Sequence, residues 1–232
     1  LTGGPRAVAA GVDRHFPHAR VHIVPRWRRP HRGAPEAAFA HRLAMLRTAF
    51  AGDAWAFVDR REASIAAGRP GPVHAMEVVE DLHRELGADA PLLWVLGEDS
   101  FASLPSWHRW EAFVAAVGLI VIPRPVAASG DRPAVPVALR SHVEVAPDPE
   151  ALLRAPRGRS WALEAPLSPA SATGARERLA AGRSTQGLLP PAVARYARVH
   201  GLYGARASSS APVAGAARGG ARTPGTVENH DA

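Results

Sequence analysis

Two hydroxyls and a guanidinium lie close together in the segment Ser171-Ala-Thr-Gly-Ala-Arg176, at the start of a predicted helical run that continues to Gly182. The first turn of a helix has unpaired N–H donors and the positive end of the helix dipole. The side chains of Ser171 and Thr173 can therefore cap this turn and still face an anion. Arg176, one turn further along, has a fork of donors that matches a phosphate group. Taken alone, such a segment is more often an ordinary Ser/Thr cap, but the rest of the chain favours a phosphate site.

The predicted strands and helices that must position this segment alternate along the chain. Apolar spacing predicts helices over residues 5–16, 36–51, 74–86, 107–117, 148–154 and 190–200, and strands over 20–24, 55–59, 91–96, 118–122 and 160–163. The runs at 91–96 and 118–122 are continuously apolar, which is typical of strands covered on both faces. The pattern predicts an α/β fold with a doubly wound parallel sheet. Ligands of such sheets bind at the carboxyl ends of the strands.

The composition indicates one domain. With 232 residues, of which 47% are hydrophobic, the chain suits a domain over 1–204 followed by a Gly/Ala/Ser/Pro tail over 205–232 that is too poor in large apolar groups to fold alone. No window approaches the roughly 20 apolar residues of a membrane span, and no signal peptide is recognisable. Cysteine is absent, which excludes disulfides, thiolate zinc sites and cysteine nucleophiles. We therefore expect a cytoplasmic protein with no membrane partner.

The chain has a net charge of +7, and all of its strongly basic residues are arginine. Basic domains bind nucleic acid by counterion release, so this class competes with an enzyme function. Apart from Arg26 to Arg32 the arginines are scattered, and the abundance of Ala, Gly and Pro is typical of a GC-rich coding bias. We therefore expect no nucleic-acid partner. The adjacent Arg60 and Arg61 are expected either to be solvated or to lie near a phosphate loop.

Short motifs at the predicted turns carry a resemblance to a known family. They are Arg29-Pro-His-Arg32, Phe39-Ala-His-Arg-Leu-Ala-Met-Leu46, Val58-Asp-Arg-Arg-Glu62, Leu96-Gly-Glu-Asp-Ser100, Leu104-Pro-Ser-Trp-His-Arg-Trp-Glu111, Leu119-Ile-Val-Ile-Pro-Arg-Pro125, Ser171 to Arg176, Leu188-Leu-Pro-Pro-Ala-Val193 and His200-Gly-Leu-Tyr203. In order and spacing the chain resembles the bacterial nicotinate mononucleotide adenylyltransferases of the nucleotidyltransferase α/β superfamily. The resemblance implies a Rossmann-like nucleotidyltransferase fold. It also implies transfer of AMP from ATP to nicotinate mononucleotide, giving deamido-NAD and pyrophosphate in NAD biosynthesis.

The resemblance implies an ATP-phosphate site. Ser171, Thr173 and Arg176 match a hydroxyl-hydroxyl-arginine motif that holds ATP phosphates at a helix N-terminus. His31 and Arg32 match a mobile loop beside the triphosphate. Nucleotidyl transfer depends on positioning and on neutralising negative charge, which arginines and helix-end donors supply. Mg²⁺ is expected to arrive with ATP by bridging its phosphates, with no protein ligand assigned to it.

The resemblance implies a mononucleotide site as well. Arg124 matches the arginine that meets the mononucleotide phosphate, and Gly97 and Asp99 match the turn that lines the nucleotide cleft. Trp107 matches the aromatic residue that stacks on the nicotinate ring. His74 and His108 fall where the family has a hydroxyl-bearing Ser-Tyr-Thr element and an aromatic residue. As donors these two histidines can meet the nicotinate carboxylate, and as solvated helix residues they would have no such role.

One departure concerns the start of the chain. Family members open with a strand, a Gly-Gly-Thr/Ser-Phe-Asp-Pro loop and a His-x-Gly-His element whose histidines stabilise the transferring phosphate. This chain starts at Leu1-Thr-Gly-Gly-Pro-Arg6, and residues 5–16 already match the helix that follows that element. We therefore expect the first strand and the catalytic histidines to be missing from this chain, so no catalytic residue is assigned. A degenerate, non-catalytic nucleotide-binding protein of the same fold is accordingly the alternative to an active enzyme. The sequence predicts no oligomeric state.

Overall fold

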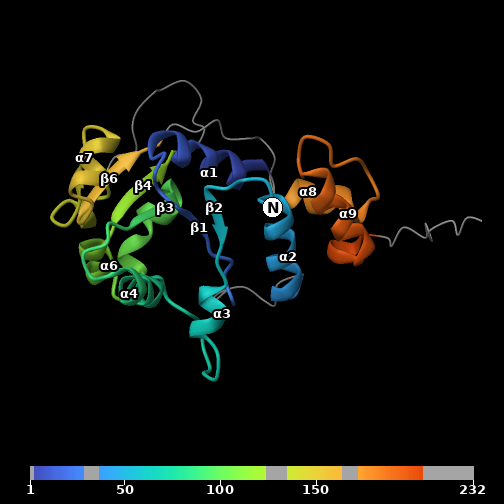
Figure 1. Ribbon diagram of the computed structural model, residues 1–232, viewed down its shortest axis with the longest axis horizontal. Helices are drawn as coiled ribbons and strands as arrows, with labels where there is room; N and C mark the ends of the chain where they lie inside the picture. The colour runs from blue at the N-terminus through green and yellow to red at the C-terminus, as the bar shows by residue number, and fades with distance from the viewer. Residues whose placement is uncertain (1–2, 29–36, 124–134, 164–171, 206–232) are drawn as a thin grey trace, which may run out of the picture.

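The structure is a computed structural model that describes residues 3–28, 37–123, 135–163 and 172–205 (Figure 1). Its strands are β1 (Val21–Ile23), β2 (Ala56–Val58), β3 (Leu93–Gly97), β4 (Gly118–Ile122), β5 (Glu144–Val145) and β6 (Arg159–Ala162). Its helices are α1 (Gly3–His15), α2 (Phe39–Ala49), α3 (Arg61–Ile65), α4 (Ala75–Leu86), α5 (Glu98–Ala102), α6 (Trp110–Ala116), α7 (Pro149–Arg154), α8 (Ala172–Ala180) and α9 (Pro191–Val199). Single 3₁₀ turns lie at η1 (Leu104–Ser106), η2 (Val137–Leu139) and η3 (Leu202–Gly204).

The elements expected from the sequence are confirmed, with ends that shift by up to three residues. The elements that sequence analysis missed are α3, α5, β5 and the 3₁₀ turns, none of which is longer than five residues. Elements this short complete too few periods to leave a hydrophobic pattern. None of the helices in the described part of the chain is long and apolar enough to cross a membrane. The tail expected over 205–232 lies outside the described residues from 206 onward.

The described strands form two parallel sheets. β1 pairs with β2, and the other sheet has the order β3-β4-β6-β5. All of these pairs are parallel, so the expected α/β class with helical crossovers is confirmed. None of the described strands is hydrogen-bonded to both β1 and β3, so these strands fall into two groups. The helix α1 precedes β1 and packs against it.

The core is built on the two faces of β4, in which every residue is buried. Leu119 and Val121 face the cluster formed with α4 and α6, whereas Ile120 and Ile122 face the cluster formed with α1 and α7. This alternation explains the continuous apolar run, because both faces of the strand are covered. At Gly118 a side chain would not fit, since a Cβ atom there would lie 2.8 Å from the Leu93 Cδ2 atom.

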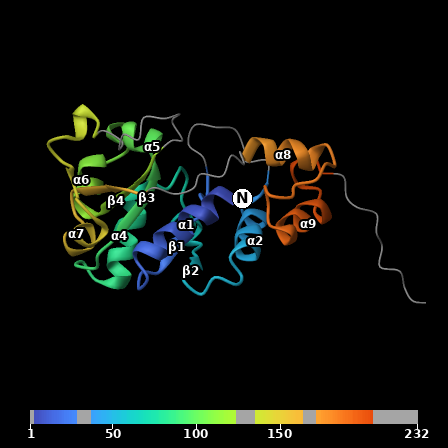
Figure 2. The same ribbon diagram turned by 90° about the horizontal axis from the view of Figure 1, so that it is seen from above.

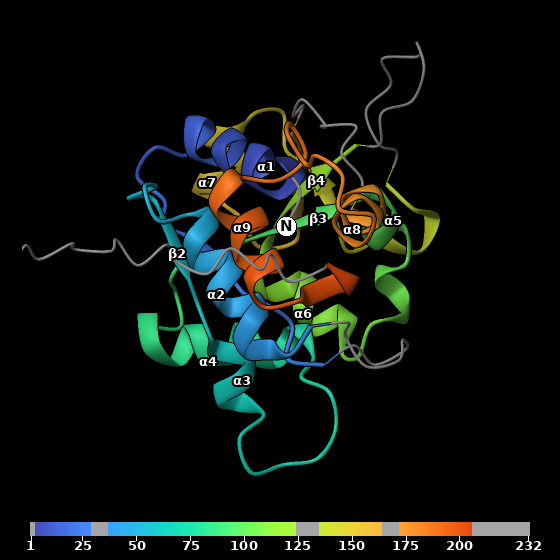
Figure 3. The same cartoon turned by 90° about the vertical axis from the view of Figure 1, so that its right-hand side faces the viewer.

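The helices α8 and α9 pack with α2 in a separate apolar cluster. In Figures 1 and 2 these three helices lie together, on the other side of the molecule from α4 and α6. Figure 3 looks from the side of α8 and α9 and shows α2 behind α9, with which it is in contact. Leu179 of α8 is buried in this cluster with Val193 and Ala197 of α9. Gly182, with φ +65°, lies in the turn that ends α8.

Candidate active site

The turn after β3 carries two of the expected site residues. Gly97 pairs with Ile122, so the carboxyl ends of β3 and β4 lie level at one edge of the sheet. Gly97 is extended (φ −75°, ψ 158°) and directly precedes α5. Asp99 lies in the first turn of α5 and is exposed to solvent. These two residues thus lie at the edge where ligands of parallel sheets bind, whereas Arg124, expected after β4, lies outside the described residues.

Trp107 does not lie on a helix, contrary to the expectation of one helix over 107–117. The 3₁₀ turn η1 ends before it, and its N–H donates to the Leu104 carbonyl at 2.9 Å. Arg109 then adopts a left-handed conformation (φ 56°, ψ 37°), which breaks the helical path, so that α6 begins at Trp110. The Trp107 ring is half-buried and packs on Phe113, with ring centroids 5.5 Å apart. The expected stacking residue is therefore held in a loop by a buried aromatic side chain.

His74 and His108 are brought together although they are distant in sequence. Their ring centroids are 4.5 Å apart, with the ring planes inclined by 37°. His74 is the N-cap residue of α4, and its N–H donates to the Glu77 carboxylate at 2.7 Å. Glu77 also pairs with Arg69 at 2.6 Å, and this hydrogen bond is the main cause of its lowered pKa. His108 is exposed and directly follows Trp107 in the chain, so the two imidazoles lie together at the start of α4, one residue along the chain from the expected stacking residue.

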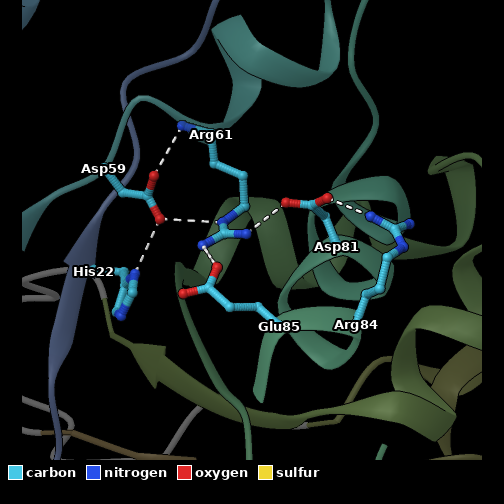
Figure 4. Close-up of polar contacts among 6 residues, drawn as sticks. All are labelled: His22, Asp59, Arg61, Asp81, Arg84 and Glu85. Carbon is cyan, nitrogen blue, oxygen red and sulfur yellow. Dashed lines mark hydrogen bonds and ion pairs between the residues drawn. The ribbon is translucent and has the colours of Figure 1, made fainter. Parts of the chain in front are cut away.

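A network of charges, buried at Asp59 and Arg61, links the carboxyl end of β2 to α4 (Figure 4). Asp59 accepts from the Arg61 N–H at 2.9 Å and from Arg61 Nε at 3.1 Å, and its other contact is His22 Nδ1 at 3.0 Å. Arg61 also binds Asp81 at 2.5 Å and Glu85 at 2.6 Å, both on α4. The expectation of a solvated Arg61 is wrong, since its side chain is 9% exposed and contacts three carboxylates, whereas a position near a phosphate loop stays a prediction.

The pKa values in this network follow from its pairing. Burial alone would raise the pKa of Asp59, but its contacts with His22 and Arg61 outweigh burial and lower it. Burial alone would lower the pKa of Arg61, but its contacts with Glu85, Asp81 and Asp59 outweigh burial and raise it. Both groups are therefore held in their charged forms. The pair of Asp59 and Arg61 is buried and expensive to break, and the contacts of Arg61 with Asp81 and Glu85 connect it to α4, the helix that His74 caps.

The structure describes only some of the expected ATP-phosphate residues. Thr173 and Arg176 lie in the first five residues of α8, with Thr173 exposed and Arg176 half-buried. The residues Ser171, His31 and Arg32 lie outside the described residues. The structure therefore brings His74 and His108 together, with Trp107 next to His108 in the chain. Thr173 and Arg176 lie on α8, which packs beside α2 and α9, away from α4 and α6 (Figures 1 and 2). Among the described residues, no group of three or more His, Asp or Glu side chains is arranged to hold a metal ion.

The family model described as cytidylyltransferase-like matches residues 3–178. A relative from Yersinia pestis (strain Pestoides F), named "Probable nicotinate-nucleotide adenylyltransferase", is 39% identical over 182 residues, which covers 78% of this chain and 80% of the relative. The chain belongs to this family of adenylyltransferases. A relative of the same name from Marinobacter nauticus is 36% identical over 204 residues, covering 88% of this chain and 91% of its own length. The resemblance expected from the turn motifs is therefore confirmed.

Solved structures agree with the fold. The structure of Plasmodium falciparum nicotinic acid mononucleotide adenylyltransferase complexed with NaAD matches with a TM-score of 0.63 and 15% sequence identity. The match covers 88% of this chain and 91% of the Plasmodium chain. A second structure of the Plasmodium enzyme, complexed with APC, matches with a TM-score of 0.58. At this identity the similarity extends to the nucleotidyltransferase-like α/β fold.

Proposed function

We propose that this chain transfers AMP from ATP to nicotinate mononucleotide and releases pyrophosphate. The observation that carries the proposal is the 39% identity, over 182 residues, to a relative named for this activity. In the reaction a phosphate oxygen of the mononucleotide attacks the α-phosphorus of ATP. A bond forms between that oxygen and phosphorus, the bond to the β-phosphate oxygen breaks, and pyrophosphate leaves with the negative charge. The product of the attack is deamido-NAD.

The chain's part in this reaction is to orient two anions and to neutralise their charge. Arg176 and the hydroxyl of Thr173, at the start of α8, are proposed to bind ATP phosphates together with Ser171, His31 and Arg32. Mg²⁺ is proposed to enter as part of the substrate, bridging ATP phosphates and completing its coordination with water. Positioning of this kind supplies most of the catalysis in phosphoryl-type transfer.

The pyridine end of the acceptor is proposed to bind at the group of Trp107, His74 and His108. The indole of Trp107, supported from behind by Phe113, offers a face on which the pyridine ring can stack. The neighbouring imidazoles are N–H donors, so they can bind the nicotinate carboxylate. Nicotinamide mononucleotide lacks that negative charge. The chain is therefore proposed to prefer nicotinate mononucleotide, with Arg124, Gly97 and Asp99 contacting the rest of the mononucleotide.

The test is product formation from defined substrates. The purified chain is incubated with ATP, Mg²⁺ and nicotinate mononucleotide, and deamido-NAD and pyrophosphate are quantified separately. The expected result is one pyrophosphate for each deamido-NAD, with a rate that falls to background when EDTA removes Mg²⁺. A parallel preparation, expressed with the in-frame codons upstream of Leu1, measures any catalytic contribution of residues encoded there. Binding of both substrates without dinucleotide formation in either preparation would refute the proposal.

A further inference from the structure

One guanidinium ties together two segments of backbone that flank residues 28–36. Arg42, on α2, donates from Nη1 to the Arg26 carbonyl at 2.6 Å and from Nη2 to the Trp27 carbonyl at 3.2 Å. Its Nε donates to the Ala37 carbonyl at 3.3 Å. Arg26 and Trp27 directly precede residues 28–36, and Ala37 directly follows them. A single planar fork of donors therefore fixes the distance between the two ends of this segment.

Glu62, on α3, binds the same backbone as a hydrogen-bond acceptor, whereas Arg42 binds it as a donor. Its carboxylate accepts from the Trp27 N–H at 2.6 Å, and the residue is 7% exposed. Burial raises its pKa, against the lowering effects of the Trp27 N–H and of the positive charges on Arg26 and Arg42. The N–H of Trp27 is thus bound by Glu62 and its carbonyl by Arg42. The indole of Trp27 is also fixed, by Phe39 at a ring distance of 4.9 Å.

We call Arg42 and Glu62 the clamp. Its position in the fold indicates a role in function as well as in packing. Burying a carboxylate costs free energy unless it is well paired, and an apolar contact would join two loops without that cost. The clamp acts on the residues that follow β1 at its carboxyl end, the end of a parallel strand at which ligands bind. The chain then runs directly into Arg29-Pro-His-Arg32, which contains two of the expected phosphate ligands.

We infer that Arg42 and Glu62 are positioning residues for the adenylyl transfer, acting on ATP through the backbone of Arg26 and Trp27. The inference rests on the proposed function. The clamp touches neither substrate in this account. It sets where the chain leaves β1 and where it returns at Ala37, the two ends of the segment that contains the expected phosphate ligands His31 and Arg32.

The first experiment separates the two substrates kinetically. Arg42→Ala and Glu62→Ala are each expected to lower kcat/KM for ATP about tenfold or more, because a lost charge-assisted hydrogen bond misplaces the attached backbone. The KM for nicotinate mononucleotide is expected to change less than about twofold, since its proposed pyridine site lies on other elements. Arg47→Ala is the matched control, since Arg47 is an exposed arginine on the same helix. It should leave both constants unchanged.

Conservative variants give a readout that a purely structural role would not. Glu62→Gln is expected to keep activity within about threefold of the wild type, because the amide oxygen still accepts from the Trp27 N–H. Arg42→Lys is expected to be as impaired as Arg42→Ala, because one ammonium cannot serve carbonyls on both sides of the segment. Melting temperatures are measured in parallel. If kcat/KM for ATP, corrected for the folded fraction, is unchanged in both alanine variants, the inference is wrong.

The second experiment does not depend on activity. Trypsin cleaves after arginine, and its rate of cleavage between Arg26 and Arg32 is followed in the wild type and in each variant. Faster cleavage is expected in Arg42→Ala and Glu62→Ala but not in Arg47→Ala or Glu62→Gln. Equal rates in all variants would overturn the clamp whether or not the enzyme is active. A wild-type chain that forms no deamido-NAD but shows this cleavage pattern would refute the proposed function and leave the clamp standing.

Discussion

Replacing Trp107 with alanine tests the acceptor site. The indole is half-buried against Phe113, so its exposed face is proposed to stack on the pyridine ring. Stacking of a base on an aromatic side chain contributes about 1–3 kcal/mol. At about 1.36 kcal/mol per tenfold change, the KM for nicotinate mononucleotide should rise roughly 5- to 150-fold. The KM for ATP should change less than about twofold, because none of the proposed ATP-phosphate residues belongs to the segment around Trp107, and Thr173 and Arg176 lie on α8.

The same substitution has a stability cost that can be separated from its effect on binding. Removing the contact with Phe113 should cost about 0.5–1.5 kcal/mol beyond the loss of apolar area, which lowers the melting temperature by a few degrees. Trp110→Ala is the control, because Trp110 is also partly buried against this core and contacts His142 at a ring distance of 5.0 Å. Steady-state kinetics with each substrate varied in turn gives both constants. Equal increases in the two KM values, or the same increase in Trp110→Ala, would refute the stacking role.

Replacing both His74 and His108 with alanine should lower kcat/KM for nicotinate mononucleotide about tenfold or more, since hydrogen bonds to a charged group contribute about 1.5–3 kcal/mol. The kcat/KM for nicotinamide mononucleotide should not fall. Equal losses with the two substrates would count against a role of the two histidines in binding the carboxylate. Arg176→Ala should raise the KM for ATP about tenfold, whereas Arg178→Ala, which removes an exposed arginine of the same helix, should not. Burial raises the pKa of Glu62, so the folded state binds its proton more tightly than the unfolded state does. The protonated carboxyl therefore contributes to the free energy of unfolding below about pH 4.3, and this contribution is lost as the pH rises through the raised pKa. Glu62→Gln should therefore lose less stability relative to the wild type at about pH 7 than at about pH 4 in urea unfolding, and the opposite trend would contradict this pKa shift.

Much of the fold was predictable because its signals are local. The run Gly118–Ile122 is continuously apolar because alternate residues face two different clusters, and this pattern can be recognised in the sequence. The division into two sheets was not predictable, because pairing between strands is a long-range property. The start of α6 was misplaced for a different reason. Trp107 and Trp110 have helical spacing, but the left-handed backbone of Arg109 separates them, and no periodicity reveals that.

For the site, the sequence could predict only which residues belong to it, from the order of the family motifs along the chain. That order correctly identified the family, and it drew attention to His74, His108 and Trp107. The contact between His74 and His108 depends on how α4 packs against α6, and no sequence pattern reveals that packing. The role of Arg61 was missed for the same reason, since its partners Asp81 and Glu85 lie 20 and 24 residues further along the chain. A charged residue directly after a strand was the available signal, but it does not distinguish a buried ion pair from a solvated one.

The central claim is that this chain joins AMP to nicotinate mononucleotide in preference to its amide. The most direct measurement is a competition in which one reaction contains ATP, Mg²⁺ and equal concentrations of nicotinate and nicotinamide mononucleotide, with both dinucleotides resolved by chromatography. Deamido-NAD is expected to exceed NAD by about tenfold or more, and pyrophosphate to equal the sum of the two. Equal amounts of the two dinucleotides, or pyrophosphate released without either, would contradict it.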